Sequence, residues 1–428
     1  MSRASRRPIG RYDALVLASL LWFLAKLLRY AFPPLFETLG AEYGVSTAAL
    51  GTAFTAFMLV YAAMQFPSGV LADRIGPVWV LVGGALVAAV GSFAVVVAGP
   101  FLALVGAMVL IGLGTGAHKT VAIGLLTRVY PGRSGRALGV HDTFGTFGGV
   151  AAPAIVAGLL ASSATDWRAL FLVGAGVAVL LAGSTAVRVP RHLPDAGGSG
   201  GDRDGDHEED REDDGAAADG DDVRSSGEPG LTAYAAPFRE PRVAGFVALT
   251  LCFSFAYSGV VAFLPLYLTQ TAGLSTTAAS LLYGLLFAVS VVQLGTGELS
   301  DRVGRRAVIG WTIGLATVAL LALVAMPATG PQIAGVPVWT AAVVAALGIG
   351  SHGFRPVRAV HLDAILPSSL AGGGLGAVRT ALMGAGAVSP AIVGVLADAA
   401  GFRVAFGLLL ATLGVALALA VTLWAVDR

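Results

Sequence analysis

Twelve stretches of about 20 mostly apolar residues dominate this sequence, and each is long enough to cross a lipid bilayer as a helix. They begin near Tyr12, Thr47, Val78, Phe101, Ala137, Arg168, Arg242, Thr276, Ala307, Val338, Gly372 and Arg403. Only 12% of the 428 residues are charged and the mean hydropathy is +0.79, whereas soluble domains carry roughly 25% charged residues. The sequence therefore predicts an all-α integral membrane protein with twelve transmembrane helices.

A hydrophilic segment divides these stretches into six and six. Residues 190–237 include the run GGSGGDRDGDHEEDREDDGAAADGDD, whose density of charge leaves nothing to bury. We interpret this segment as a disordered acidic linker in the cytoplasm. Residues 1–189 and 238–428 are then expected to form an N-terminal and a C-terminal six-helix bundle.

The arginines of the short predicted loops gather on one side of the membrane, which the positive-inside rule identifies as the cytoplasmic side. They are Arg3, Arg6, Arg7, Arg11, Arg74, Arg128, Arg133, Arg136, Arg302, Arg305 and Arg306. Both termini are therefore expected in the cytoplasm, and the protein in the plasma membrane. The acidic linker and the preference for arginine over lysine suit a halophilic, haloarchaeal-type host, and a GC-rich genome explains the arginines equally well.

The two halves repeat one another in sequence. The matched segments are QFPSGVLADRIG and QLGTGELSDRVGRR, GTGAHK and GIGSHG, LGVHDT and LGAVRT, and DWRALF and GFRVAF. Asp142 thereby stands opposite Arg379, and Pro153 stands opposite Pro390. Such an internal repeat is typical of transporters built from a duplicated helical unit.

On these residues the chain resembles the major facilitator superfamily of secondary transporters. The loop motif of that family appears as GVLADRIG and again as GELSDRVGRR, at the equivalent cytoplasmic loop of each half. The resemblance implies two pseudo-symmetric six-helix bundles that expose a central site to alternate sides of the membrane. It assigns a gating role to the motif residues Gly69, Asp73, Arg74, Gly76, Gly297, Asp301, Arg302, Gly304, Arg305 and Arg306. In the gating hypothesis, Asp73 and Asp301 contact the N-terminal end of a helix in the opposite bundle; alternatively they only stabilise the turns.

Cations inside the predicted helices outnumber acids, which favours an anion as the substrate. Lys26 and Lys119 are the only lysines of the chain, and Arg29 lies one helical turn from Lys26. We predict that the substrate is bound by Lys26, Arg29, Lys119, Arg355 and Arg379. Two alternatives stay open, in which Lys26 pairs with an acid such as Asp142, or Asp142 pairs with Arg379. Arg358 is expected near a helix end, as an anchor.

Coupling to H+ or Na+ is expected, with His118, His141, Asp142 and His352 as candidate proton carriers. We therefore predict a monomeric transporter of a small organic or inorganic anion. A multidrug or sugar exporter of the same fold is the alternative, and a non-transporting receptor or scaffold is a third. No nucleophile, phosphate-binding loop or cysteine cluster appears, so neither an enzyme, a metal site, a cofactor nor a nucleic-acid partner is expected.

Overall fold

The computed structural model describes residues 12–189, 240–325, 330–333, 335–365 and 373–426, without the side chains of residues 363 and 373–382. The predicted linker, residues 190–237, lies outside the described residues.

Helices form nearly all of the described part of the first half. They are α1 (Asp13–Tyr43), α2 (Thr47–Ala63), α3 (Gln65–Ile75), α4 (Pro77–Val97), α5 (Phe101–Val129), the short 3-10 helix η2 (Pro131–Arg133), α6 (Ser134–Ala161) and α7 (Arg168–Arg188).

The described part of the second half follows the same plan. Its elements are α9 (Pro241–Gln270), α10 (Thr276–Ala288), the 3-10 helix η4 (Val289–Val292), α11 (Gln293–Val303), α12 (Arg305–Ala325), β1 (Gln332–Ile333), β2 (Val336–Pro337), α13 (Val338–Ile365), α14 (Gly373–Ala400) and α15 (Phe402–Val426). The two strands form a short antiparallel hairpin that pairs Gln332 with Pro337.

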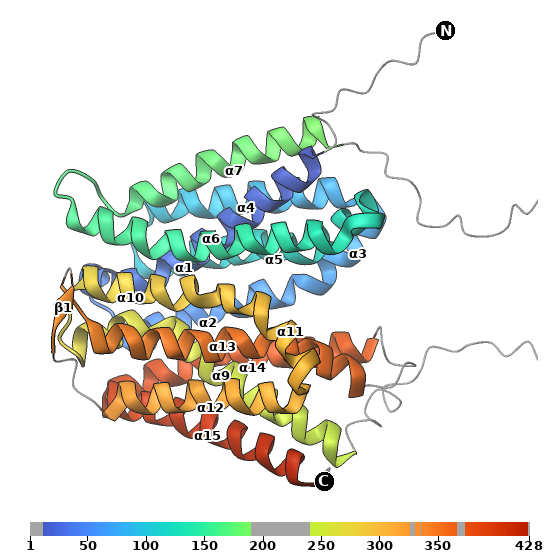
Figure 1. Ribbon diagram of the computed structural model, residues 1–428. Coiled ribbons are helices and arrows are strands. Elements are labelled where there is room, and N and C mark those ends of the chain that lie inside the picture. Colours follow the sequence, from blue (N-terminus) through green and yellow to red (C-terminus); the bar gives the residue numbers. More distant parts are fainter. Residues whose placement is uncertain (1–11, 190–239, 326–329, 334, 366–372, 427–428) are drawn as a thin grey trace, which may run out of the picture.

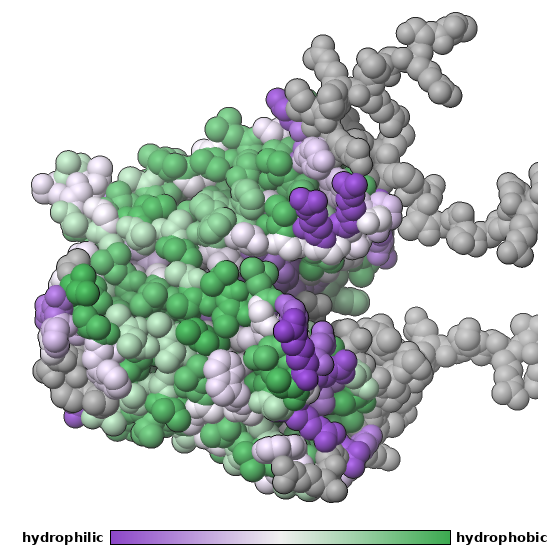
Figure 2. All heavy atoms as spheres, viewed as in Figure 1, coloured by the Kyte–Doolittle hydropathy of each residue, from purple (hydrophilic) through white to green (hydrophobic). Residues whose placement is uncertain are grey.

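The helices are arranged as two bundles that lie side by side, α1 to α7 in one and α9 to α15 in the other (Figure 1). Within the described residues, eleven helical stretches are long and apolar enough to cross a membrane. The remaining long helix is α13, which carries Arg355, Arg358 and His361. Figure 2 shows an apolar side surface, with hydrophilic groups gathered toward the ends of the bundles. The prediction of a twelve-helix membrane protein with two pseudo-symmetric bundles is confirmed.

Equivalent helices of the two halves share local details. Ser46 and Ser275 cap α2 and α10, and each hydroxyl accepts a hydrogen bond from the backbone N–H three residues later. Each of these helices is interrupted before the membrane span ends, at Met64 in the first half and by η4 in the second.

Contacts between the bundles are concentrated at one end. We call the end where α1 begins and α15 ends the terminal side, and the opposite end the far side (Figure 1). Across the interface α2 packs against α14, and α6 packs against α10. On the far side, the carboxylate of Asp398 on α14 accepts hydrogen bonds from the backbone N–H groups of Thr47 and Ala48, at 3.1 and 2.8 Å. This carboxylate therefore caps the first turn of α2 in the other bundle.

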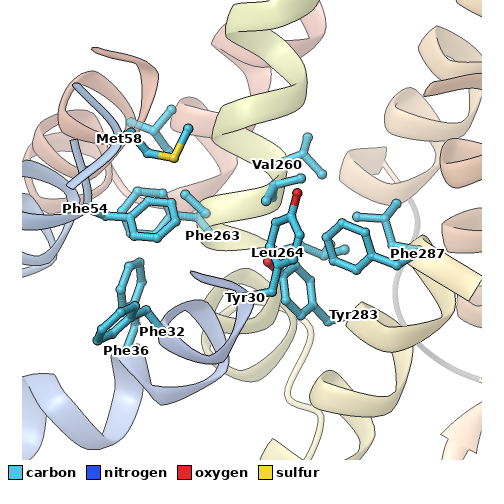
Figure 3. Packing of buried hydrophobic residues seen from close by; sticks show 14 of the residues in the cluster. Tyr30, Phe32, Phe36, Phe54, Met58, Val260, Phe263, Leu264, Tyr283 and Phe287 are labelled. Carbon is cyan, nitrogen blue, oxygen red and sulfur yellow. The ribbon is translucent and has the colours of Figure 1, made fainter. Parts of the chain in front are cut away.

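An aromatic cluster fills the interface between the bundles (Figure 3). Phe36 of α1 packs against Phe54 of α2 and Phe263 of α9, with ring centroids 5.8 and 5.5 Å apart. Nearby, Phe287 of α10 contacts both Tyr30 and Tyr283, at 4.4 and 5.1 Å. Because α1 runs from the terminal side, Phe36 lies closer to the far side than Lys26 does. The cluster therefore lies between Lys26 and the far side of the molecule.

Candidate functional site

A cavity lies between the bundles on the terminal side of the aromatic cluster. It consists of two adjoining chambers, of about 200 and 330 Å³. Residues that line both chambers are Trp22, Lys26, Tyr30, Lys119, Arg355 and Arg358. Helices α1 and α5 of one half and α13 of the other supply these side chains, so the cavity belongs to both bundles.

Lys26 is held in the cavity by two aromatic rings of its own helix. Trp22, Lys26 and Tyr30 are spaced by four residues, which places them on one face of α1. The Lys26 Nζ lies 5.0 Å from the centroid of each ring, and it donates a hydrogen bond of 3.2 Å to the Tyr30 hydroxyl. Such cation–π contacts contribute roughly 0.5–2 kcal/mol each and offset part of the cost of removing the ammonium group from water.

Arg29 occupies the same face of α1 and also contacts rings. Its Cζ lies 5.3 Å from the Tyr30 ring and 4.9 Å from the Tyr61 ring of α2. The Arg29 Nε is buried and has no hydrogen-bond partner among the described residues. An unused donor of this kind in a cavity is suited to an anionic ligand.

The opposite bundle contributes Arg355 of α13. Its Cζ lies 5.6 Å from the ring of Tyr257, and the Tyr257 hydroxyl lies 3.5 Å from the His352 Nε2. His352 is buried and lines the larger chamber. Arg355 therefore faces the same space as Lys26 but belongs to the other bundle.

Asp142 of α6 is the only acidic residue among the described residues that line the two chambers. Its carboxylate forms an ion pair with Lys119 of α5 at 3.6 Å. The partner of Asp142 is thus Lys119, and the alternative in which it pairs with Lys26 does not occur here. Lys26, Arg29 and Arg355 consequently give the cavity positive charge that no described carboxylate balances.

The four candidate proton carriers separate into two groups. Asp142 and His352 line the larger chamber. His141 is buried against Trp22, with ring centroids 5.9 Å apart, and His118 is buried beside Gly84 of α4. Neither His118 nor His141 lines the described cavity walls, so Asp142 and His352 are the better placed candidates for coupling.

The structure tests the predicted position of Arg358 but not that of Arg379. Arg358 was expected to anchor a helix end, but α13 continues to Ile365 and Arg358 lines both chambers. The side chain of Arg379 lies outside the described residues, so its predicted role in binding stays a prediction.

The repeated loop motif lies on the terminal side in both halves. Gly76 and Gly304 end α3 and α11 with φ of 89° and 93°, a backbone conformation that only glycine adopts without strain. Asp73 accepts a hydrogen bond of 3.2 Å from Arg128 of α5, and Arg302 donates one of 2.5 Å to Glu298. Both contacts lie within a single bundle. The gating role predicted for the motif, including Gly69, Arg74, Gly297, Asp301, Arg305 and Arg306, stays a prediction.

Sequence reasoning missed several aromatic residues of the cavity. Trp22, Tyr61, Phe253 and Phe287 line its walls. The spacing of Trp22 and Tyr30 about Lys26 could have revealed two of the ring contacts, since all three belong to one helix. Tyr61 comes from another helix, and its contact with Arg29 depends on how α1 and α2 are rotated.

Fold and cavity together define a polytopic membrane transporter with a positively charged central site. The profile of the Major Facilitator Superfamily matches residues 18–333 and 286–428. The chain therefore belongs to the major facilitator superfamily, whose members are transporters and not enzymes.

Two curated transporters are similar to part of the chain. The probable sulfoacetate transporter SauU of Cupriavidus necator is 29% identical over 164 residues, 38% of each chain. The 4-hydroxybenzoate transporter PcaK of Pseudomonas putida is 31% identical over 181 residues, which are 42% of this chain and 40% of the relative. The alignments thus span about two fifths of each relative. The halophilic origin inferred from composition stays a prediction.

Solved structures extend the similarity of fold to nearly the whole chain. A bacterial homologue of the human lysosomal transporter Spinster superimposes with a TM-score of 0.74 at 16% identity, over 98% of both chains. The nucleoside transporter NupG gives a TM-score of 0.75 at 14% identity, over 97% of this chain and 100% of that one.

Proposed function

We propose that this protein is a secondary active transporter that works by alternating access and moves a small organic anion. The observation that carries the proposal is the group of Lys26, Arg29 and Arg355, which face one cavity and have no acidic partner among the described residues. Cations held in place without counterions bind carboxylates, sulfonates or phosphates through charge-assisted hydrogen bonds. The names of the two curated relatives, transporters of sulfoacetate and 4-hydroxybenzoate, support an organic anion over an inorganic one.

The packing between the bundles supports a conformation open toward the terminal side. Hydrogen bonds from Asp398 and the packing of Phe36 against Phe263 join the bundles on the far side. On the terminal side, α3 packs against α4 and α5 of its own half, and α11 packs against α12 and α13. We propose that the terminal side is cytoplasmic, with both termini there, and that the protein works as a monomer in the plasma membrane.

Coupling to H+ or Na+ belongs to the same proposal. Asp142 and His352 line the larger chamber, and we propose them as the groups that exchange protons there. Sodium dependence at constant pH, compared with pH dependence in the absence of sodium, distinguishes the two ions.

The alternative functions require a different cavity. An exporter of lipophilic cations needs acidic groups on the walls, and the described walls contain only Asp142, which is paired. A sugar carrier or a receptor of this fold has no need for unbalanced cations in the membrane, where each costs roughly 2.5–3.5 kcal/mol on insertion scales.

A thermal-shift panel on the purified protein tests the proposal. Sulfoacetate, 4-hydroxybenzoate, acetate, phosphate, glucose and a lipophilic cation are added at increasing concentrations to the wild type and to Lys26→Ala, Arg29→Ala and Arg188→Ala. Arg188 is an exposed cation at the end of α7 and serves as the matched control. A ligand at about 100 times its Kd adds roughly 2.7 kcal/mol of stability.

We expect at least one organic anion to stabilise the wild type and Arg188→Ala but not the two cavity variants. Stabilisation by glucose or the lipophilic cation alone contradicts the proposal. So does an anion response that Lys26→Ala and Arg29→Ala both retain.

A further inference from the structure

We infer that the substrate is a compact, non-aromatic dianion whose two anionic groups are bound by cations of opposite bundles. The inference rests on the proposed transport of an organic anion, and it adds the charge and the shape of that anion.

The first support is the division of the cations between the bundles. Lys26 and Arg29 belong to α1 in the first half, and Arg355 belongs to α13 in the second. Lys26 and Arg355 both line both chambers, so a ligand placed between them contacts both bundles. A ligand with an anionic group at each end gives the cations of each bundle an acceptor of their own, whereas a ligand with one anionic group has to share its oxygens between them.

The second support is that the aromatic walls are already in use. The Trp22 ring lies 5.0 and 5.5 Å from the Nζ atoms of Lys26 and Lys119, and it stacks on His141. The Tyr30 ring contacts Lys26, Arg29 and Phe287. These rings hold the cations in place, so they offer no open platform on which an aromatic substrate can stack.

The aromatic rings that the second half contributes to the cavity are also in contact with other groups. Tyr257 stacks on Phe253 with an interplanar angle of 6°, and its ring is also contacted by Arg355. Phe287 is packed between Tyr30 and Tyr283. An aromatic substrate that stacks on these rings displaces one of these contacts, whereas an aliphatic one has only to reach the charged groups.

Size and charge agree with a small aliphatic dianion. The smaller and the larger chamber measure about 200 and 330 Å³, and each alone has room for a small aliphatic ion, while the joined cavity falls within the roughly 300–1,000 Å³ typical of ligand pockets. Two negative charges also balance the cavity better than one, since Lys26, Arg29 and Arg355 all lack an acidic partner in the described part of the chain. Sulfo-carboxylates and dicarboxylates share the required chemistry.

Binding measurements with matched ligands test the inference. Thermal shifts give apparent affinities for sulfoacetate and malonate as dianions, for acetate and methanesulfonate as the corresponding monoanions, and for 4-hydroxybenzoate as an aromatic acid. We expect both dianions to bind at least about tenfold more tightly than any of the other three, because a second charge-assisted hydrogen bond supplies a factor of this size.

The variant Arg355→Gln locates the second contact. It should reduce affinity for sulfoacetate and malonate by about tenfold and change that for acetate by less than about threefold, and Arg355→Lys should recover part of the loss. Loss of all anion binding in Arg355→Gln contradicts the inference that each bundle binds one of the two anionic groups.

Failures of the inference and of the proposed function are distinguishable. If acetate or 4-hydroxybenzoate binds the wild type as tightly as the dianions, the dianion inference is overturned while organic-anion transport stands. If none of the five anions binds the wild type, both are overturned. The wild-type panel decides the question even if a variant does not fold.

Discussion

Replacing Asp398 with alanine should shift the protein away from the conformation closed on the far side. The Asp398 carboxylate accepts two backbone hydrogen bonds from the first turn of α2 across the interface between the bundles. Loss of an N-cap costs about 0.5–2 kcal/mol, and loss of a charge near a helix N-terminus costs about 0.3–1 kcal/mol. Because Asp398 is exposed to water, we take a value of about 1 kcal/mol, which changes the ratio of the two conformations about fivefold.

Pulsed electron paramagnetic resonance measures this ratio directly. Spin labels are placed at Ala41→Cys and Ala400→Cys, two exposed positions on the far side, after replacing the only native cysteine by Cys252→Ser. The short-distance population reports the closed far side, and it should fall in Asp398→Ala. In Asp398→Asn, which retains one acceptor oxygen but no charge, it should fall by less.

The matched control is Asp166→Ala. Asp166 is another exposed far-side carboxylate, but its partner is Arg168 of the same half. If the ratio of the short-distance to the long-distance population in Asp398→Ala stays within about twofold of the wild-type ratio, the role of the cap is refuted. If Asp166→Ala changes this ratio as much as Asp398→Ala does, the effect is due to surface charge alone.

Two further predictions concern packing and the cavity ion pair. In Gly350→Ala the new Cβ would lie 2.6 Å from the backbone nitrogen of Ala316 and from the Thr312 carbonyl oxygen; we expect a loss of about 1–3 kcal/mol in a thermal melt, and none in the unobstructed control Gly310→Ala. The Lys119 and Asp142 side chains are 32% and 63% exposed, so a double-mutant cycle on stability should give a coupling below about 1 kcal/mol. A Gly310→Ala loss equal to that of Gly350→Ala, or a coupling above about 2 kcal/mol, contradicts these estimates.

Helix positions were predictable because each membrane span is a continuous apolar stretch of the sequence. The expected starts at Phe101, Arg168 and Thr276 coincide with those observed, and the expected start at Ala137 differs from Ser134 only because polar residues extend α6. The interruption at Met64 was not foreseen. Its local signal is Pro67, which lacks the N–H that would donate to the Ala63 carbonyl four residues earlier.

The candidate site was predictable in composition but not in pairing. Lys26 and Arg29 were found because charge inside an apolar stretch is rare, and their spacing fixed a common face. The choice of Lys119 over Lys26 as the partner of Asp142 depends on the relative depth of α1, α5 and α6, which no local pattern contains. Arg358 was misjudged for a similar reason, since the length of α13 beyond it was unknown.

The interruptions of α2 at Met64 and of α10 at η4 have a mechanical consequence. Each divides a membrane span into a part that packs against the other bundle and a part, α3 or α11, whose main described contacts are with helices of its own bundle. A rigid span would act as a lever and transmit any movement at the loop motif straight to the far-side contacts. If the bundles rock as proposed, a joint in each span lets the terminal side move without breaking the far-side contacts, so that the two entrances need not open together.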